Sequence, residues 1–161
     1  MSSDPIRVAL VGAGFFARIH LDAWRRLDGV RLVAVCDRDP ATHAHVTSVD
    51  EHIPIYDELD TMLSAEEPDL VDIATPPDTH LSLVADTVAR GLDVICQKPL
   101  APTREESERL VEVCEKAGVV LAVHENIRWA PWHREIARLI DAGKIGRLHR
   151  ISMRLRPGDG Q

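Results

Sequence analysis

A glycine-rich segment near the N-terminus carries the strongest chemical signal in the sequence. It spans residues 8–17, where the apolar Val8–Val11 precedes Gly12-Ala-Gly14-Phe-Phe-Ala17. Gly12 permits a tight turn, Gly14 lets the backbone approach a pyrophosphate, and a small residue at Ala17 lets a helix pack closely. Free N–H groups and the positive end of the helix dipole would then meet the phosphate oxygens. The residues of this segment predicted to bind the cofactor are Gly12, Gly14, Phe15 and Phe16.

An acidic residue follows the next apolar stretch at the spacing that a dinucleotide site requires. The predicted strand over 31–36 ends at Asp37, 20 residues after Ala17. A carboxylate there accepts hydrogen bonds from the ribose hydroxyls and repels a 2′-phosphate, which favours NAD over NADP. Arg38 has two interpretations, a partner for a 2′-phosphate or a solvated loop arginine. The alternative for the whole pattern is a glycine turn in another kind of doubly wound protein.

Two further polar segments follow later predicted strands, where ligands bind in open α/β sheets. The first, residues 74–80, contains two prolines that stiffen a turn, and Asp78 is expected to cap the following helix. His80 fits a packed or capping role as well as a cofactor-side role. The second, residues 96–100, contains Lys98, whose ammonium group is either desolvated, with a lowered pKa, or extended into water.

Strand-like and helix-like segments alternate along the first part of the chain. Continuous runs rich in Val, Ile and Leu are typical of strands that are covered on both faces. Thr103 and Glu106 have the spacing of a capping box, and Gly118 follows the apolar stripe of the same predicted helix. This alternation predicts an α/β fold with a doubly wound parallel sheet of the Rossmann type. The predicted strands cover residues 6–11, 31–36, 53–56, 70–74, 93–96 and 119–123.

The pattern changes after residue 124. A helix is predicted over 131–142, with Ile136, Leu139 and Ile140 facing inward, and alternating residues predict a half-exposed strand over 148–156. One strand cannot bury its own apolar face. We therefore expect this part to be the beginning of a truncated α+β domain, whose exposed strand edge promotes homo-oligomers.

The charge distribution changes near the same point. The formal net charge is −12 over residues 1–127 and +5 over residues 128–161. A shift of this kind is a candidate domain boundary. The expected domains are a dinucleotide-binding domain over 1–124 and the start of a substrate and oligomerisation domain over 125–161.

Composition excludes several classes of function. The 161 residues carry a net charge of −7, which disfavours nucleic-acid and anionic-membrane partners. No apolar run approaches the length of a spanning helix, no signal peptide is evident, and the cysteines have no metal-binding spacing. We expect a cytoplasmic protein without a metal site, in which Cys36, Cys96 and Cys114 are buried reduced thiols.

Several motifs together resemble the Gfo/Idh/MocA oxidoreductase family, in order over almost the whole chain. They are GAGFFARIH, CDRDP, TPPDTH, GLDVICQKPLA and HENIRWAPW…GKIGRLHRI. The resemblance implies a Rossmann domain followed by a domain with a large, mostly antiparallel sheet. It also implies an enzyme that transfers hydride between NAD or NADP and a sugar, inositol or related polyol.

The resemblance also assigns roles to single residues. In the family, the segment matching Thr75, Pro76 and His80 lies beside the cofactor. The Glu-Lys-Pro element of the family corresponds to Gln97-Lys98-Pro99, where the lysine contacts the reacting part of the substrate and the nicotinamide ribose. The Lys-Pro bond is often cis. The implied substrate-side residues are His124, Asn126, Arg128 and Trp129.

Two departures from the family pattern affect these expectations. Gln97 replaces the glutamate, which removes a negative charge beside Lys98, although an amide still forms hydrogen bonds. The aspartate and histidine that form the family's acid–base pair have no counterpart before residue 161. Two other functions are therefore kept open. One is a stand-alone dinucleotide-binding module without turnover. The other is a methyltransferase, which TPPDTH and QKP disfavour.

Overall fold

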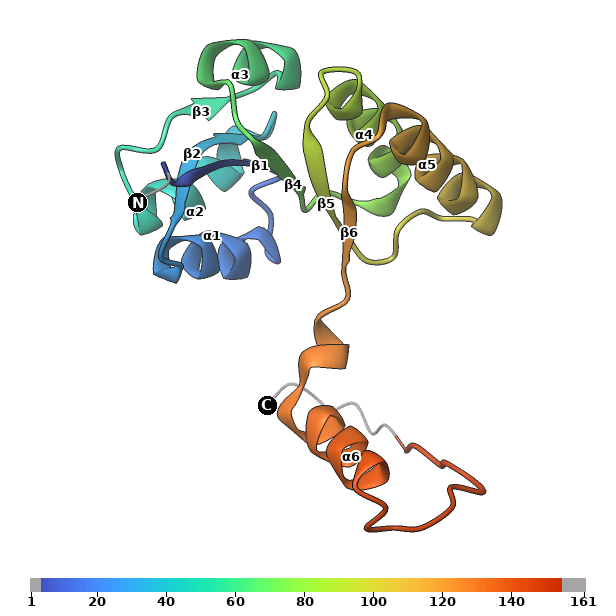
Figure 1. Ribbon diagram of the computed structural model, residues 1–161. Helices are drawn as coiled ribbons and strands as arrows, with labels where there is room; N and C mark the ends of the chain where they lie inside the picture. The colour runs from blue at the N-terminus through green and yellow to red at the C-terminus, as the bar shows by residue number, and fades with distance from the viewer. Residues whose placement is uncertain (1–3, 155–161) are drawn as a thin grey trace. The chain divides into compact units, whose positions relative to one another are not determined.

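Six parallel strands form one sheet in the computed structural model, which describes residues 4–154 (Figure 1). The strand order within these residues is β3-β2-β1-β4-β5-β6. The strand bounds are β1 Ile6–Val11, β2 Val30–Cys36, β3 Ile55–Tyr56, β4 Leu70–Ile73, β5 Asp93–Gln97 and β6 Leu121–His124. All six coincide with predicted strands to within a few residues, so the doubly wound parallel fold is confirmed.

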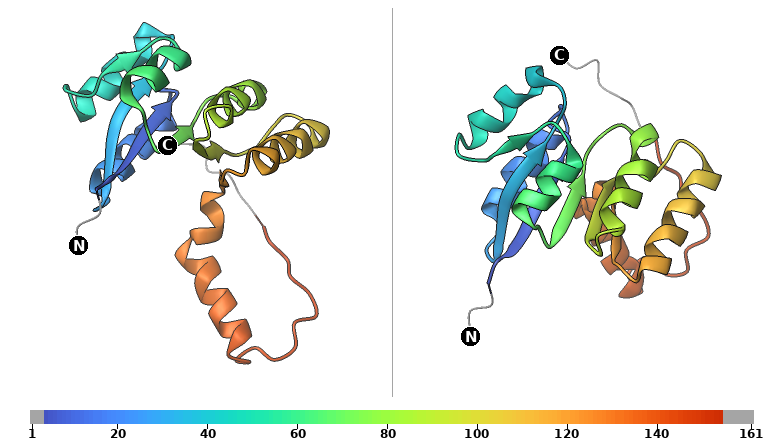
Figure 2. Two further views of the ribbon diagram at one scale, coloured as in Figure 1. Left: turned by 45° about the horizontal axis from the view of Figure 1, so that its top comes forward. Right: turned by 90° about the horizontal axis from the view of Figure 1, so that it is seen from above.

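Helices cover both faces of this sheet, as the two views of Figure 2 show. One apolar cluster joins α1 and α2 to the sheet through Leu10, Leu21 and Val46. A second cluster on the opposite face joins α3, α4 and α5 through Met62, Val84 and Leu110. The helix bounds are α1 Ala17–Arg26, α2 Pro40–Val49, α3 Leu59–Glu66, α4 His80–Val88 and α5 Arg104–Ala117, with a short 3-10 turn η1 at Pro77–Thr79.

The face that carries α1 contains a polar residue in an otherwise apolar row. Leu10 of β1 is in register with Asp72 of β4, which is in register with Ile95 of β5. Because side chains alternate between the faces of a strand, these three side chains lie on the same face. Asp72 is only 1 % exposed. A buried carboxylate requires hydrogen-bond partners. Its Oδ2 contacts His20 and Trp24 of α1, whereas its Oδ1 has no hydrogen-bond partner among the described residues.

The long helix α5 has the ends that its sequence predicts. The backbone N–H of Glu106 donates to Thr103 Oγ1 at 3.2 Å, and Gly118 follows the helix in the left-handed conformation. Leu110 and Cys114 are the buried side chains of this helix. The predicted cap and apolar stripe of α5 are confirmed.

Removing this cap should lower stability by a measurable amount. We expect Thr103→Ala to reduce the free energy of unfolding by about 1 kcal/mol, because one helical N–H loses its acceptor. Urea unfolding followed by circular dichroism measures the change. Arg109→Ala, at an exposed position within the same helix, is the control and should stay within about 0.5 kcal/mol of the parent. Equal losses in both variants would contradict the capping role.

Two sequence predictions in this part have different outcomes. All three cysteines are buried and unpaired, as expected. The expectation that Asp78 caps a helix is wrong. Asp78 lies inside the 3-10 turn η1, and Thr79 occupies the N-cap position of α4 without a side-chain cap bond. The 3-10 turn occupies Pro77–Thr79, so α4 begins at His80, one residue later than a cap at Asp78 would place it.

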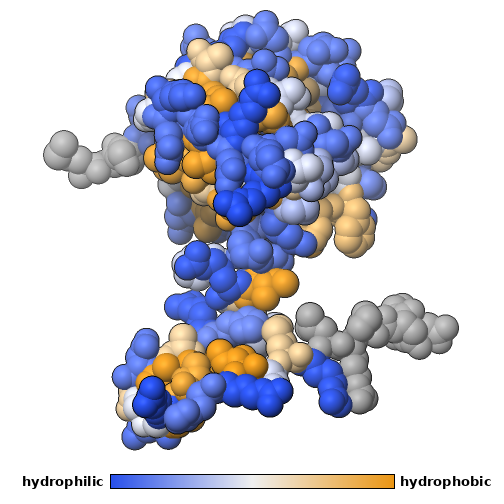
Figure 3. Space-filling model, turned by 90° about the vertical axis from the view of Figure 1, so that its right-hand side faces the viewer, coloured by the Kyte–Doolittle hydropathy of each residue, from blue (hydrophilic) through white to orange (hydrophobic). Residues whose placement is uncertain are grey.

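Contacts divide the chain into two units, one ending at His124 and the other beginning at Glu125. The described part of the second unit contains a 3-10 turn, η2 (Asn126–Trp129), and helix α6 (Pro131–Asp141). No residue of α6 is fully buried: Ile136 is exposed, whereas Leu139 and Ile140 are half-buried, so the expected inward-facing stripe is present only in part. Figure 3 shows apolar side chains gathered on the surface of this unit.

The strand predicted over 148–156 is not observed in its described part, residues 148–154. Leu148, Ile151 and Met153 are instead exposed. A strand is stable only when a neighbouring strand accepts and donates its backbone hydrogen bonds. No such neighbour lies among the described residues of this unit. Residues 155 and 156, the last of the prediction, lie outside the described residues. No helix among residues 4–154 is long and apolar enough to span a membrane.

Candidate functional site

The carboxyl ends of the parallel strands bring the predicted site segments to one edge of the sheet. Strands β2, β1, β4 and β5 are neighbours in that order. The segments that follow them begin with Asp37, Gly12, Ala74 and Lys98. Ligands of open α/β sheets bind at this edge, beside the point where the strand order reverses. In this sheet the reversal lies between β1 and β4.

The glycine loop is fixed from several sides. Gly12 has φ +99°, and its N–H donates to the Cys36 carbonyl at 2.8 Å. A Cβ at Gly12 would lie 2.9 Å from the carbonyl oxygen of Ala74, so only glycine fits between β1 and β4 here. The N–H of Ala13 donates to Asp37 Oδ2 at 2.6 Å. Asp37 therefore couples the end of β2 directly to the glycine loop.

Helix α2 also holds this loop. His45 Nδ1 lies 3.0 Å from the carbonyl oxygen of Ala13. His43 Nε2 lies 2.9 Å from the carbonyl oxygen of Asp37. The loop residue Ala13 is thus bound through both its N–H and its carbonyl group. Gly14, the next residue, faces open space, because no heavy atom lies within 4 Å of the position that a Cβ would occupy there.

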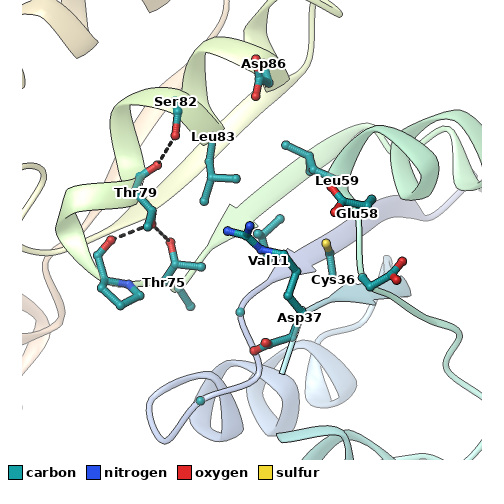
Figure 4. A pocket seen from close by; sticks show the side chains of 16 residues that line it. Val11, Cys36, Asp37, Glu58, Leu59, Thr75, Thr79, Ser82, Leu83 and Asp86 are labelled. Carbon is teal, nitrogen blue, oxygen red and sulfur yellow. Dashed lines mark hydrogen bonds between the residues drawn. The ribbon is translucent and has the colours of Figure 1, made fainter. Parts of the chain in front are cut away.

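A cavity of about 480 Å³ opens between the glycine loop, the end of β2 and the start of α4 (Figure 4). It is lined by backbone and side chains from the segments predicted to bind a cofactor. Figure 4 shows Asp37 on one side of this cavity and Thr75 and Thr79 on the other. Its predicted lining residues are Gly12, Gly14, Asp37, Arg38, Thr75 and Pro76.

Acidic side chains dominate this cavity. Asp37, Asp57, Glu58 and Asp86 line it together with one basic residue, Arg38. Both oxygens of Asp37 already accept backbone hydrogen bonds, from Ala13 and from Asp39. Each carboxylate oxygen has a second lone pair for another donor. Both oxygens of Asp37 therefore have acceptor capacity left for donors in the cavity.

The thiol in this cavity is not a nucleophile at neutral pH. Burial, followed by the charge of neighbouring Asp37, raises the pKa of Cys36 to about 11. A thiol with such a pKa stays protonated near pH 7, and the thiolate is the reactive form. Cys36 contributes packing beneath the site.

The segment after β4 is held by its own hydroxyl groups. Thr75 Oγ1 and Thr79 Oγ1 lie 2.7 Å apart, and Thr79 Oγ1 donates to the Pro76 carbonyl at 2.7 Å. His80 is fully buried behind this turn. Its ring nitrogens lie 2.9 Å from the Thr75 carbonyl oxygen and 3.0 Å from the Leu100 carbonyl oxygen. His80 therefore connects the segments after β4 and β5, which fits its packed interpretation.

Lys98 and Gln97 lie at the end of β5, apart from the residues that line the cavity. Lys98 is exposed, and its Nζ lies 5.9 Å from the centroid of the Phe16 ring. The Lys98–Pro99 peptide bond is cis, as the family resemblance implies. Gln97 is 6 % exposed, and its side chain faces other protein groups. The exposed ammonium agrees with the interpretation in which the Lys98 head group extends into water.

The implied substrate-side residues fall on both sides of the unit boundary. His124 ends β6 in the first unit, where its Nδ1 lies 3.2 Å from Gln97 Nε2. Asn126, Arg128 and Trp129 belong to η2 of the second unit. Within that unit the Arg128 guanidinium lies 5.2 Å from the centroid of the Trp129 ring, at cation–π distance.

Comparison with known proteins identifies the fold's family. The model of an oxidoreductase family with an NAD-binding Rossmann fold, Gfo/Idh/MocA, matches residues 6–125. The chain belongs to the Gfo/Idh/MocA oxidoreductase family. A D-apiose dehydrogenase from Paraburkholderia graminis is 44 % identical over 138 residues, covering 86 % of this chain and 37 % of the relative.

Other Gfo/Idh/MocA members show the same extent of similarity. Inositol 2-dehydrogenase 4 from Saccharopolyspora erythraea is 36 % identical, over 91 % of this chain and 44 % of that protein. An oxidoreductase from Agrobacterium radiobacter, solved with NAD+, L-tartaric acid and magnesium, has a TM-score of 0.85 and 33 % identity. That match covers 90 % of this chain and 42 % of the solved chain. The chain thus spans about two-fifths of the length of these relatives.

The geometry of this Gfo/Idh/MocA domain fits a dinucleotide. The open space over Gly14 receives no heavy atom of the protein, and the carboxylate of Asp37 has acceptor capacity left toward the cavity. Among residues 4–154, no group of three or more His, Cys, Asp and Glu side chains could hold a metal ion.

Sequence reasoning missed part of this site. The lining residues that were not predicted as contacts include the polar Asp57, Glu58, Ser82 and Asp86. These four come from the segment just before α3 and from α4, whose positions over the sheet edge follow from tertiary packing. The acidic pair Asp57-Glu58 directly after β3 is a signal that could have indicated this wall, because β3 ends at the same edge.

Proposed function

We propose that this chain is the cofactor-binding part of an oxidoreductase that transfers hydride between a nicotinamide dinucleotide and a sugar, inositol or related polyol. The observation that carries the proposal is the coupling of Asp37 to the glycine loop beside an acidic cavity. Relatives named as D-apiose dehydrogenase and inositol 2-dehydrogenase support a polyhydroxylated substrate. Because the chain covers 37 % and 44 % of these relatives, the dehydrogenase activity of the whole protein is also proposed.

Different residues along the sheet edge bind different parts of the dinucleotide. The N–H groups around Gly14 and the N-terminal end of α1 bind the diphosphate, and the dipole of α1 favours its negative charge. The free acceptor positions of Asp37 bind the adenosine ribose hydroxyls. Thr75 and Pro76 line the opposite wall, near the strand reversal. The dinucleotide then extends along the edge from Asp37 toward Lys98.

Lys98 acts at the far end of this edge. When bound, the dinucleotide accepts or supplies hydride at C4 of its nicotinamide ring. The ammonium group of Lys98 donates a hydrogen bond to the substrate oxygen and polarises the carbon–oxygen bond. The family resemblance implies further substrate-side residues, which are His124 in the first unit and Asn126, Arg128 and Trp129 in the second. The aromatic Phe16 ring holds the Lys98 head group near the glycine loop.

The acidic cavity predicts a preference for NAD over NADP. We expect NAD to bind about tenfold or more tightly, equal to about 1.4 kcal/mol, because a 2′-phosphate would face the Asp37 carboxylate at short range. Titration by energy transfer from the tryptophans to the reduced nicotinamide measures the affinities for NADH and NADPH, and displacement of NADH gives those for NAD and NADP.

A variant separates the two charged residues at this position. Arg38→Ala should leave the affinity for NAD within a few-fold of the parent and weaken any residual NADP binding. Equal or tighter binding of NADP by the parent chain would show that Arg38 outweighs Asp37. Absence of binding to either dinucleotide would refute the proposed function itself.

A further inference from the structure

Five polar and aromatic side chains form a network next to Lys98; His20, Asp72 and Gln97 are buried, and Trp24 and His124 are half-buried. His20 Nδ1 lies 2.7 Å from Asp72 Oδ2, and the Trp24 indole N–H donates to the same oxygen at 2.8 Å. The amide nitrogen of Gln97 lies 3.1 Å from His20 Nε2 and 3.2 Å from His124 Nδ1. We call Asp72, His20, Gln97 and His124 the imidazole–amide network.

One backbone group fixes the orientation of the whole network. The N–H of Lys98 lies 2.8 Å from Gln97 Oε1 and can only donate. The Gln97 carbonyl oxygen must therefore face Lys98, and its NH₂ group must face the two imidazoles. A flipped amide would place two donors against each other at Lys98. Both His20 Nε2 and His124 Nδ1 are consequently acceptors.

These acceptor roles determine where the imidazole protons lie. With Nε2 accepting, His20 carries its proton on Nδ1 and donates it to the carboxylate of Asp72. His124 carries its proton on Nε2, because its Nδ1 accepts. The two rings pack edge to face with centroids 4.4 Å apart, an arrangement that suits two neutral rings. A neutral amide at position 97 satisfies both rings at once, whereas a carboxylate would face two lone pairs.

We propose that Asp72 and His20 act through Gln97 as positioning residues for Lys98, and that the amide of Gln97 is matched to two neutral imidazoles. This inference rests on the role proposed above for Lys98. Asp72 anchors the chain of bonds at a residue that is 1 % exposed, on β4 at the centre of the sheet. Gln97 in turn accepts the hydrogen bond from the backbone N–H of Lys98, so it fixes the backbone of Lys98, whose own side chain is exposed.

The elements that pack around the network each contribute a charged or titratable side chain. Asp72 lies on β4, His20 on α1, His124 on β6 and Lys98 directly after β5. Cys96 of β5 is also near the Asp72 carboxylate, and burial raises its pKa to about 12, so this thiol stays uncharged. The network therefore contains one carboxylate and two imidazoles, with the Lys98 ammonium outside it over Phe16.

Nitrogen-15 spectroscopy of the histidine rings tests the matching directly on the full 161-residue chain. At pH 7 we expect His20 protonated on Nδ1 alone and His124 on Nε2 alone. In Gln97→Glu, at least one ring should carry a proton on the nitrogen that faces residue 97, either as a second proton on that ring or by a shift of the His124 proton from Nε2 to Nδ1, because the new carboxylate oxygen requires a donor. A doubly protonated His20 in the parent, or unchanged protonation sites on both rings in Gln97→Glu, would overturn the matching.

Hydrogen exchange of the Lys98 amide tests the positioning. Loss of the bond to Gln97 should speed exchange about tenfold, the equivalent of one hydrogen bond. We expect this acceleration in Gln97→Ala and in His20→Ala. Trp24→Phe is the matched control, since it removes the other bond to the same Asp72 oxygen without touching Gln97, and should leave the exchange rate unchanged.

These measurements are independent of cofactor binding and turnover. An unchanged Lys98 exchange rate in His20→Ala would overturn the positioning role even if the chain binds NAD. If His20→Ala does not fold, Asp72→Asn replaces it, because the smaller change removes the anchoring charge with little change in shape. Conversely, a chain that shows the expected ring protonation but no NAD binding would refute the proposed function and leave the network assignment standing.

Discussion

Lys98→Ala should lower the turnover of the whole protein about a hundredfold or more while the affinity for NAD stays within a few-fold of the parent. The reason is position. Lys98 follows β5, at the far end of the edge from Asp37, and lies outside the residues that line the cavity. An interaction made with the reacting oxygen affects kcat, whereas uniform binding of the dinucleotide does not depend on it. Steady-state kinetics on a panel of sugars and polyols, with separate NAD titrations, measures both effects.

The control for this prediction is another exposed lysine of the same unit. Lys116 on α5 pairs only with Glu112 among the described residues, one helical turn earlier. Surface ion pairs of this kind contribute little. Lys116→Ala should therefore leave both kcat and the affinity for NAD unchanged. If Lys98→Ala retains turnover within a few-fold of the parent, Lys98 is a solvated surface residue and the substrate-side role is wrong.

The sheet and its glycine loop could be predicted because local sequence determines them. Each strand is a short apolar run, and Gly12, Gly14 and Ala17 occupy positions where backbone geometry limits the choice of residue. Helix α2 was not predicted, although Asp39 caps it and Pro40 begins it. Its apolar pattern is weak, with Val46 as its buried residue, so periodicity gave little signal.

The buried polar network could not be predicted because its members are far apart in the sequence. His20 and Asp72 are separated by 52 residues, and His20 and Gln97 by 77. Only the strand order places β4 and β5 beneath α1, where these side chains meet. The same dependence on partners explains the failure at residues 148–154, where the alternating pattern is typical of a strand but no described neighbour pairs with it. Long-range contacts, rather than local propensity, decide both cases.

Adding one methyl group to each of two glycines in the same loop should affect different properties, stability at Gly12 and cofactor affinity at Gly14. Gly12→Ala should lower the free energy of unfolding by about 2–4 kcal/mol, because φ is positive and the Cβ would meet backbone atoms of Ala74 at 2.9 and 3.0 Å. Gly14→Ala should leave stability within about 0.5 kcal/mol, because no heavy atom lies within 4 Å of its Cβ position. The space that this methyl group would enter is the space proposed for the diphosphate. Gly14→Ala should therefore reduce the affinity for NAD about tenfold or more.

Gly29 separates the two causes of the Gly12 effect. It also has a positive φ, +77°, but no heavy atom lies within 4 Å of its Cβ position. Gly29→Ala should therefore lose only the conformational term of about 1–2 kcal/mol, and its affinity for NAD should equal that of the parent. Thermal and urea unfolding of the three variants, with NAD titrations on each folded sample, provides the comparison. A folded Gly14→Ala chain that binds NAD as tightly as the parent would place the diphosphate elsewhere, because the methyl group would then lie in space that the ligand does not use.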